Sequence, residues 1–100
     1  MLRSRHDKSF AVVVWVKKTA TFDALRAELV AVAGSEPEES AEYEGTVNFH
    51  WWFDAQAAAK QLANSLKELA RRPEIVVLRM VNYHNIEASV TFKDTRQTRH

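Results

Sequence analysis

The sequence predicts a single α+β domain, a two-layer sandwich in which two helices pack on one face of a four-stranded mixed sheet. Three observations indicate this class: apolar residues repeat at helical spacing in two segments, they alternate with polar residues in others, and Gly34 and Pro73 lie where the helical repeats end. A length of 100 residues suits one domain. We expect that domain at residues 9–94, between flexible basic tails at residues 1–8 and 95–100.

The first strand and the first helix are predicted before Gly34. Residues 10–16 are apolar on both faces and rich in β-branched side chains, as in an interior strand. Thr21 is a suitable N-cap, Asp23 in the first turn suits the helix dipole, and Gly34 is a suitable C-cap. Between these ends one apolar stripe recurs at helical spacing: Phe22, Leu25, Leu29 and Val32.

A second strand and a second helix follow a polar loop at residues 35–42. From Tyr43 to Phe53, apolar and polar residues alternate, which predicts one strand with a strongly apolar face. Asp54 can cap the next helix, which is expected to run to Arg72 because Pro73 stops it. The apolar stripe of this helix is Ala55, Ala58, Ala59, Leu62, Leu66 and Leu69.

Two further strands complete the predicted sheet. Residues 74–81 form the third strand and residues 86–93 the fourth, and the short turn at residues 82–85 makes them an antiparallel hairpin. The element order is then β-α-β-α-β-β. Each strand-helix-strand passage favours parallel strands with a right-handed crossover, so both helices are expected on the same side of the sheet.

This element order, over residues 10–93, resembles that of three small binding modules: the C-terminal domain of bacterial translation initiation factor three, the Alba-type chromatin proteins and the TusA-type sulfur carriers. The resemblance implies the fold and a role with RNA or DNA. Alba-type proteins use a basic, glycine-containing loop and the sulfur carriers use a cysteine, and this chain has neither. No site residue is therefore transferred. The segment 51–96 also resembles small bacterial domains.

The candidate binding residues lie on the sheet face without helices. Alternation places there the more polar phase of each strand, and the opposite phase, which includes Val76, Ile86, Ala88 and Val90, faces the helices. The first set is too apolar for a solvated face and too polar for a core, which is typical of an interaction surface. The candidate residues are Trp15, Lys17, His50, Trp52, Val77, Arg79, Thr91 and Lys93.

Several functions are compatible with such a face. The leading hypothesis is a non-enzymatic interaction module that forms a homodimer, sheet against sheet or edge against edge. The second is a binder of single-stranded RNA or DNA, or of another flat ligand, in which rings stack on bases and basic side chains meet phosphates. The net charge of +1 supplies no global field for nucleic acid. A small enzyme with a His50-centred pocket and a structural role with the tails folded over the face are further alternatives.

Composition excludes several classes of chemistry. Without cysteine there is no disulfide framework, thiolate zinc site or thiol catalysis. His6, His50, His84 and His100 lack the spacing of helical metal ligands, and no glycine-rich phosphate loop exists. We therefore expect no metal, no cofactor and no catalytic residue. The longest apolar run is far shorter than a membrane span and the N-terminus lacks an apolar signal region, so a cytoplasmic location is expected.

Overall fold

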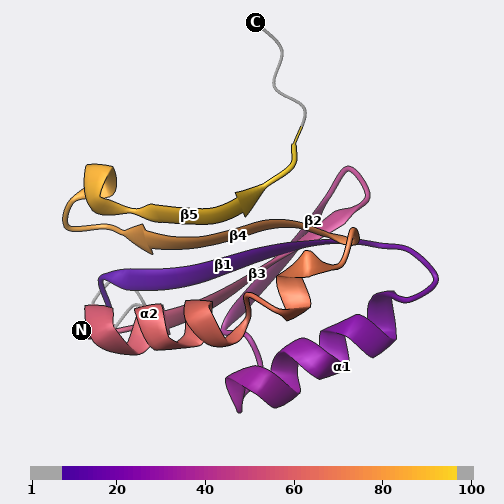
Figure 1. Cartoon of the computed structure of the whole chain (residues 1–100), viewed down its shortest axis with the longest axis horizontal. Helices are drawn as coiled ribbons and strands as arrows, with labels where there is room; N and C mark the ends of the chain where they lie inside the picture. Colours follow the sequence, from indigo (N-terminus) through magenta and orange to yellow (C-terminus); the bar gives the residue numbers. More distant parts are fainter. Residues whose placement is uncertain (1–7, 97–100) are drawn as a thin grey trace, which may run out of the picture.

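The computed structural model describes residues 8–96, and in this range it contains five strands, two α-helices and two short 3-10 helices. In chain order they are β1 (Phe10–Lys17), α1 (Phe22–Ala33), β2 (Glu39–Tyr43), β3 (Thr46–Phe53), α2 (Gln56–Ser65), η2 (Leu69–Arg71), β4 (Ile75–Asn82), η3 (Ile86–Ala88) and β5 (Val90–Asp94). The α+β class is confirmed, and both α-helices lie on the same side of the sheet (Figure 1). Most residues of the two predicted tails lie outside the described range.

The predicted second strand is a hairpin, so the sheet has five strands and not four. β2 and β3 pair antiparallel with Tyr43 opposite Thr46, which leaves a two-residue turn of Glu44 and Gly45. Both turn residues have a positive φ, 51° at Glu44 and 82° at Gly45, as a type I′ turn requires. The prediction missed this turn because Glu-Gly is not one of the usual turn pairs. The polar residues before it, predicted as a loop, form most of β2.

The sheet is antiparallel throughout, which corrects the predicted mixed sheet. Its order is β2-β3-β1-β4-β5, and every neighbouring pair is antiparallel. β1 and β2 run in the same direction, but β3 lies between them, and β1 likewise separates β3 from β4. This is the split β-α-β arrangement of ferredoxin-like folds, with β5 added at one edge. The expected β-α-β-α-β-β order is wrong, and the resemblance to the three binding modules that depended on it is not sustained.

The helices are confirmed, although their ends differ from the predicted caps. Gly34 follows α1 in the left-handed conformation, as predicted. Thr21 precedes α1, but its hydroxyl donates to Glu74 Oε2 at 2.9 Å and makes no bond to the helix backbone. Asp54 does not cap α2, which begins one residue after Ala55 and ends at Ser65. In residues 8–96 no helix is long and apolar enough to cross a membrane.

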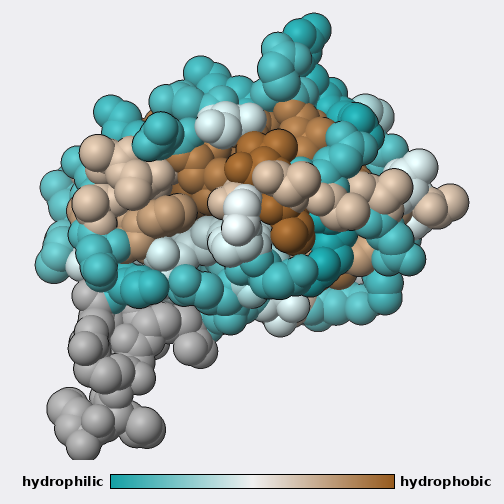
Figure 2. Space-filling view, turned by 90° about the horizontal axis from the view of Figure 1, so that it is seen from below, coloured by the Kyte–Doolittle hydropathy of each residue, from teal (hydrophilic) through white to brown (hydrophobic). Residues whose placement is uncertain are grey.

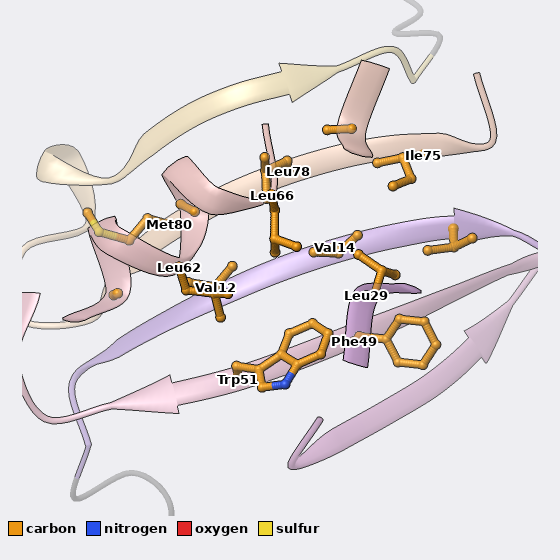
Figure 3. Close-up of a cluster of buried hydrophobic side chains, with 14 of the residues drawn as sticks. Val12, Val14, Leu29, Phe49, Trp51, Leu62, Leu66, Ile75, Leu78 and Met80 are labelled. Carbon is orange, nitrogen blue, oxygen red and sulfur yellow. The ribbon is translucent and has the colours of Figure 1, made fainter. Parts of the chain in front are cut away.

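The main core lies between the sheet and the helices, as the predicted apolar phases require. Trp51 belongs to it, and its indole Nε1 donates to Ser35 O at 3.1 Å, so the polar atom of this large buried ring is paired. Figure 3 shows side chains of β1, β3 and β4 facing those of α1, α2 and the residue that follows α2: Val12, Val14, Phe49, Trp51, Leu78, Met80, Leu29, Leu62 and Leu66. Full burial of one such aliphatic or aromatic side chain contributes roughly 1.5–3 kcal/mol, so this cluster is the main source of stability.

An apolar patch remains on the side of the molecule where the helices lie. Val32, predicted to be the last buried residue of its stripe, is 44% exposed. Together with Phe53 and Leu62 it lines a hollow of about 300 Å³ between the helices. Figure 2 shows apolar surface in the middle of this side, bordered by polar residues. The apolar stripe of α1 is therefore buried as far as Leu29, and its last residue, Val32, remains exposed.

The predicted hairpin of the last two strands is confirmed, but the predicted alternation is not kept. Residues 86–88 form η3, so Ile86 and Ala88 are exposed and do not face the helices. The register shifts leave one extra residue in β4 and one in β5, namely Val76 and Phe92. A bulge of this kind places neighbouring residues on the same side of a sheet. Val76, predicted to face the helices, consequently lies beside Trp15 on the opposite side.

Candidate interaction surface

The sheet face opposite the helices, called the uncovered face below, consists of rows of side chains that cross the strands. One row contains Glu39, His50, Val13, Arg79 and Thr91, in the order β2-β3-β1-β4-β5. The next row contains Ala41, Asn48, Trp15, Val77 and Asp94 in the same order. On the other side of the first row lie Trp52, Ala11 and Val81. The uncovered face thus contains Trp15, His50, Trp52, Val77, Arg79 and Thr91 of the predicted binding residues.

The apolar side chains of the uncovered face are buried within the single chain. Ala11, Val13, Trp52 and Val81 form a second hydrophobic cluster, smaller than the main core, and Trp15 packs against it. Even the large indole of Trp52 exposes only 6% of its surface. The face is therefore a polar and aromatic layer over a small apolar cluster, and not a bare apolar sheet.

Three aromatic rings stack on one another along this face. The rings of His50 and Trp52 have centroids 6.2 Å apart at an interplanar angle of 17°. The ring of Tyr83 lies 5.2 Å from that of Trp52 at 27° and is the exposed end of the series, since Tyr83 is 50% exposed. Trp52 Nε1 donates to Glu39 Oε1 at 3.4 Å. These contacts fix the plane of the Trp52 indole and leave Tyr83 half exposed at the surface.

Trp15 carries a guanidinium group on its ring. Arg96 Cζ lies 4.5 Å from the ring centroid, in the geometry of a cation–π contact. Arg96 also donates from Nε and Nη2 to the two carboxylate oxygens of Asp94, at 2.9 and 2.6 Å. These hydrogen bonds lower the pKa of Asp94 and raise the pKa of Arg96, so the pair stays ionised. Beside it, Trp15, Tyr43 and Arg96 border a hollow of about 370 Å³.

Two polar atoms on the uncovered face are buried without a hydrogen-bond partner among the described residues. They are Asn48 Oδ1, next to Trp15, and Arg79 Nε, next to Val13. A buried polar atom that lacks a partner costs about 1–3 kcal/mol. Asn48 is on β3 and Arg79 is on β4, the two strands that flank β1 in the middle of the sheet.

Of the other two predicted binding residues, Lys17 lies at the end of the uncovered face and Lys93 lies on the helical side. Lys17 ends β1 and lines a hollow at the end of the sheet with Thr19 and Glu74. Lys93, placed on the uncovered face by simple alternation, lies on the helical side, where its Nζ donates to Ala70 O at 2.6 Å and to Arg72 O at 3.0 Å. The prediction for Lys93 is wrong because the bulge at Phe92 reverses the alternation.

Sequence reasoning missed three residues of this surface. Tyr83 was assigned to a turn, Arg96 to a tail, and Tyr43 to the start of the second strand. The sequence carried no signal for Arg96, because the predicted alternation of Thr91 and Lys93 continues to Thr95, and Asp94 and Arg96 reach the face only as a result of the bulge at Phe92. Tyr43 is 61% exposed at the β2 margin.

His50 borders a hollow of about 470 Å³, the setting that an acid–base role would need. Ser40 also lines it, but Ser40 pairs with Phe49 and therefore points to the opposite side of the sheet from His50. Glu38 is held by Lys8, whose Nζ lies 3.4 Å away. The hollow does not combine His50 with a hydroxyl nucleophile. Within residues 8–96, no three His, Asp or Glu side chains are grouped so that they could hold a metal ion.

Comparison of the chain with protein-family models, curated proteins and solved structures gave no match. The fold and the surface therefore define the class by themselves. It is a small α+β protein with a split β-α-β core and an aromatic, arginine-containing face on its sheet. A fold of this kind does not assign a function, so the functional argument depends on the uncovered face.

Proposed function

We propose that the protein is a non-enzymatic interaction module that forms a homodimer through the uncovered face. The observation that supports this proposal is the change in residue type from the centre of that face to its margins. On the three inner strands it holds Trp15, Trp52, His50 and Arg79 and no carboxylate, whereas Glu39 and Asp94 lie on the two outer strands. Protein interfaces have the same distribution, with aromatic residues and Arg enriched at the centre and acidic residues at the rim.

The size of the face suits a dimer of this type. Five strands spaced about 4.8 Å apart cover roughly 24 Å across the sheet, and their length is about 26 Å for the three strands of eight residues and about 17 Å for the two edge strands of five residues. Surface roughness raises the accessible area above this flat figure, toward the ~800 Å² that each partner buries in a standard interface. The exposed ring faces of Tyr43 and Tyr83 add to the contact area.

Charges at the margins favour one arrangement of the two copies. β1 is the middle strand of the sheet, so a twofold axis along β1 places β2 of one copy opposite β5 of its partner. The β2 side carries Glu39 and Glu44, whereas the β4 side carries Arg79, next to Thr91 of β5. This axis therefore brings opposite charges together, which supports association and fixes its register.

The two edges of the sheet are poorly suited to dimer formation. β2 contains Glu39 and Glu42, and Glu38 and Glu44 flank it, so pairing two β2 strands would place like charges side by side. β5 has five residues and is interrupted by its bulge at Phe92. Of the two modes expected from the sequence, the structure supports sheet against sheet over edge against edge.

A matched pair of variants tests the proposal. Tyr83→Glu places a carboxylate on the uncovered face, and Val32→Glu places one at a similarly exposed position on the helical side, since the two residues are 50% and 44% exposed. We expect light scattering after size-exclusion chromatography to give a dimer for the wild type and for V32E, and a monomer for Y83E. A dimeric Y83E would contradict the use of this face, and a monomeric wild type at high micromolar concentration would contradict dimer formation.

The stacked rings favour a second candidate function, the binding of single-stranded nucleic acid. Base–aromatic stacking is worth about 1–3 kcal/mol per base, and the series His50, Trp52 and Tyr83 ends in an exposed ring. Arg79 on β4 and Arg96 over Trp15 could meet phosphates, whereas Glu39 repels them at the β2 side. The acidic margin is the reason that this function ranks second.

Tryptophan fluorescence distinguishes the two candidates. A single-stranded oligonucleotide that changes the emission at low salt, with an affinity that falls steeply as salt rises, would support nucleic-acid binding. The Tyr83→Ala variant should then bind more weakly, because it removes the exposed ring. An unchanged spectrum at low salt would exclude this function and leave self-association as the role of the face.

A further inference from the structure

A hollow of about 400 Å³ lies on the helical side of the sheet, away from the uncovered face. It is called the β5 hollow here and is lined by Lys67, Ala70, Arg71, Leu78, Phe92 and Lys93. Its origin is the added fifth strand. The helices pack against β1, β3 and β4, and β5 extends the sheet beyond them, as Figure 1 shows. The space between η2 and β5 is consequently left open.

The floor of the β5 hollow is apolar. Leu78 is 1% exposed and Ala70 is 5% exposed, and the half-buried ring of Phe92 packs against the main core. Phe92 reaches this side because it is the bulged residue of β5. In a regular strand Phe92 and Lys93 would lie on opposite faces, and the bulge instead places an aromatic ring and an ammonium group in the same hollow.

The rim of the β5 hollow is cationic. Lys67, Arg71 and Lys93 supply three positive charges, and no carboxylate is among the lining residues. Lys67 Nζ lies 5.5 Å from the centroid of the Phe92 ring, so this side chain extends over the hollow. The Arg71 guanidinium is 3.5 Å from Glu68, but both side chains are largely exposed, and the pair is weak.

Lys93 is the fixed member of the three cations. Its Nζ donates to the carbonyls of Ala70 and Arg72, at 2.6 and 3.0 Å, and an ammonium group has three protons, so one remains for a ligand. Burial lowers the pKa of Lys93, and the nearby charge of Glu74 opposes this effect. A bound anion would favour the charged form of Lys93 in the same way.

We propose that the β5 hollow binds a small amphipathic anion, with an apolar and preferably flat body on Leu78 and Phe92 and an acidic headgroup between the three cations. A volume of about 400 Å³ lies in the range of small-molecule sites, which combine apolar walls with a few polar groups that fix orientation. Carboxylate, sulfonate and phosphate-ester headgroups share the chemistry that these cations recognise.

A pair of fluorescent probes separates the contribution of the headgroup from that of the body. 8-Anilinonaphthalene-1-sulfonate carries an acidic group on an aromatic body, and N-phenyl-1-naphthylamine has nearly the same body without the acid. We expect one equivalent of the sulfonate to bind the folded full-length chain more tightly than the neutral probe does. Inorganic phosphate alone should displace the sulfonate only at much higher concentration, because it lacks the apolar body.

Two exposed lysines provide the matched variants. Lys67→Gln removes a charge from the rim, and Lys60→Gln removes the same charge from an exposed position on α2 that does not line the hollow. Loss of one nearby charge should weaken sulfonate binding about three- to tenfold in K67Q, with K60Q unchanged and the neutral probe equally bound by both. The proposal is overturned if the sulfonate does not bind, if it binds no more tightly than the neutral probe, or if K67Q and K60Q bind it alike.

Discussion

Glu39 and Thr91 lie at the two ends of one row of side chains that crosses all five strands of the uncovered face. His50, Val13 and Arg79 stand between them, each paired in register with its neighbours. In the proposed dimer, whose twofold axis follows β1, Glu39 of one copy faces Thr91 of its partner. The row therefore supplies a test of the orientation of the two copies as well as of their association.

Cysteines introduced at the two ends of this row should cross-link two copies. The chain has no cysteine of its own, so the introduced thiols react alone. Facing sheets lie about 10 Å apart, a gap that a short bismaleimide spans and a disulfide does not. We expect a covalent dimer from the double variant Glu39→Cys with Thr91→Cys, and none from either single variant. A dimer from E39C alone would place β2 against β2 and contradict the proposed axis.

The contact between Arg96 and Trp15 should depend on pH. The bonds from Arg96 hold the pKa of Asp94 below its ordinary value of 3.8. A carboxyl whose pKa is lowered by folding contributes stability above its unfolded pKa, and that contribution disappears as the pH falls through the folded value. We expect the indole N–H resonance of Trp15 to shift only below pH 3.8, as the Asp94 pair breaks. The same acid shift in Asp94→Asn would show that another group is responsible.

The turn between β2 and β3 should respond in opposite directions to two substitutions. Gly45→Ala should lower the free energy of unfolding by about 1 kcal/mol, because φ at Gly45 is 82° and no other group stands near enough to cause a clash. Glu44→Asn should raise it by a few tenths of a kcal/mol, since Asn tolerates the positive φ of 51° better than Glu does. Urea denaturation measures both changes. Equal free energies for G45A and the wild type would argue against a type I′ turn.

The helices and the main core could be predicted from the sequence because their signal is local. Leu25, Leu29, Leu62 and Leu66 repeat at helical spacing, and Val47, Phe49 and Trp51 alternate, so each buried side follows from its own segment. The same alternation placed Trp15, His50, Trp52 and Arg79 correctly on the other face. It could not give the strand order, which depends on which strand is inserted between two others.

The remaining errors come from features that a periodic pattern does not encode. One extra residue at Phe92 moved Lys93 to the helical side, and one at Val76 moved that residue to the uncovered face. Arg96 belongs to the site only because it folds back over Trp15, which lies far away in sequence. Such contacts are decided by tertiary packing, and a single sequence carries little information on them.

Replacing Arg79, at the centre of the uncovered face, should stabilise the monomer. Arg79→Met keeps a similar length and removes Nε, which is buried without a partner among the described residues. We expect the free energy of unfolding of the dilute, monomeric chain to rise by about 1 kcal/mol, while self-association weakens through the loss of a central arginine. Chemical denaturation at low concentration tests the first effect. A less stable R79M monomer would contradict this interpretation of Arg79.

The mass of the wild-type chain in solution, as a function of its concentration, tests the central claim most directly. Sedimentation equilibrium measures that mass without assumptions about shape. The uncovered face predicts a concentration-dependent rise from the monomer mass of 11.5 kDa to twice that value, with no larger species, because a twofold interface closes on itself. A mass of 11.5 kDa at every concentration up to the high micromolar range would contradict self-association through this face.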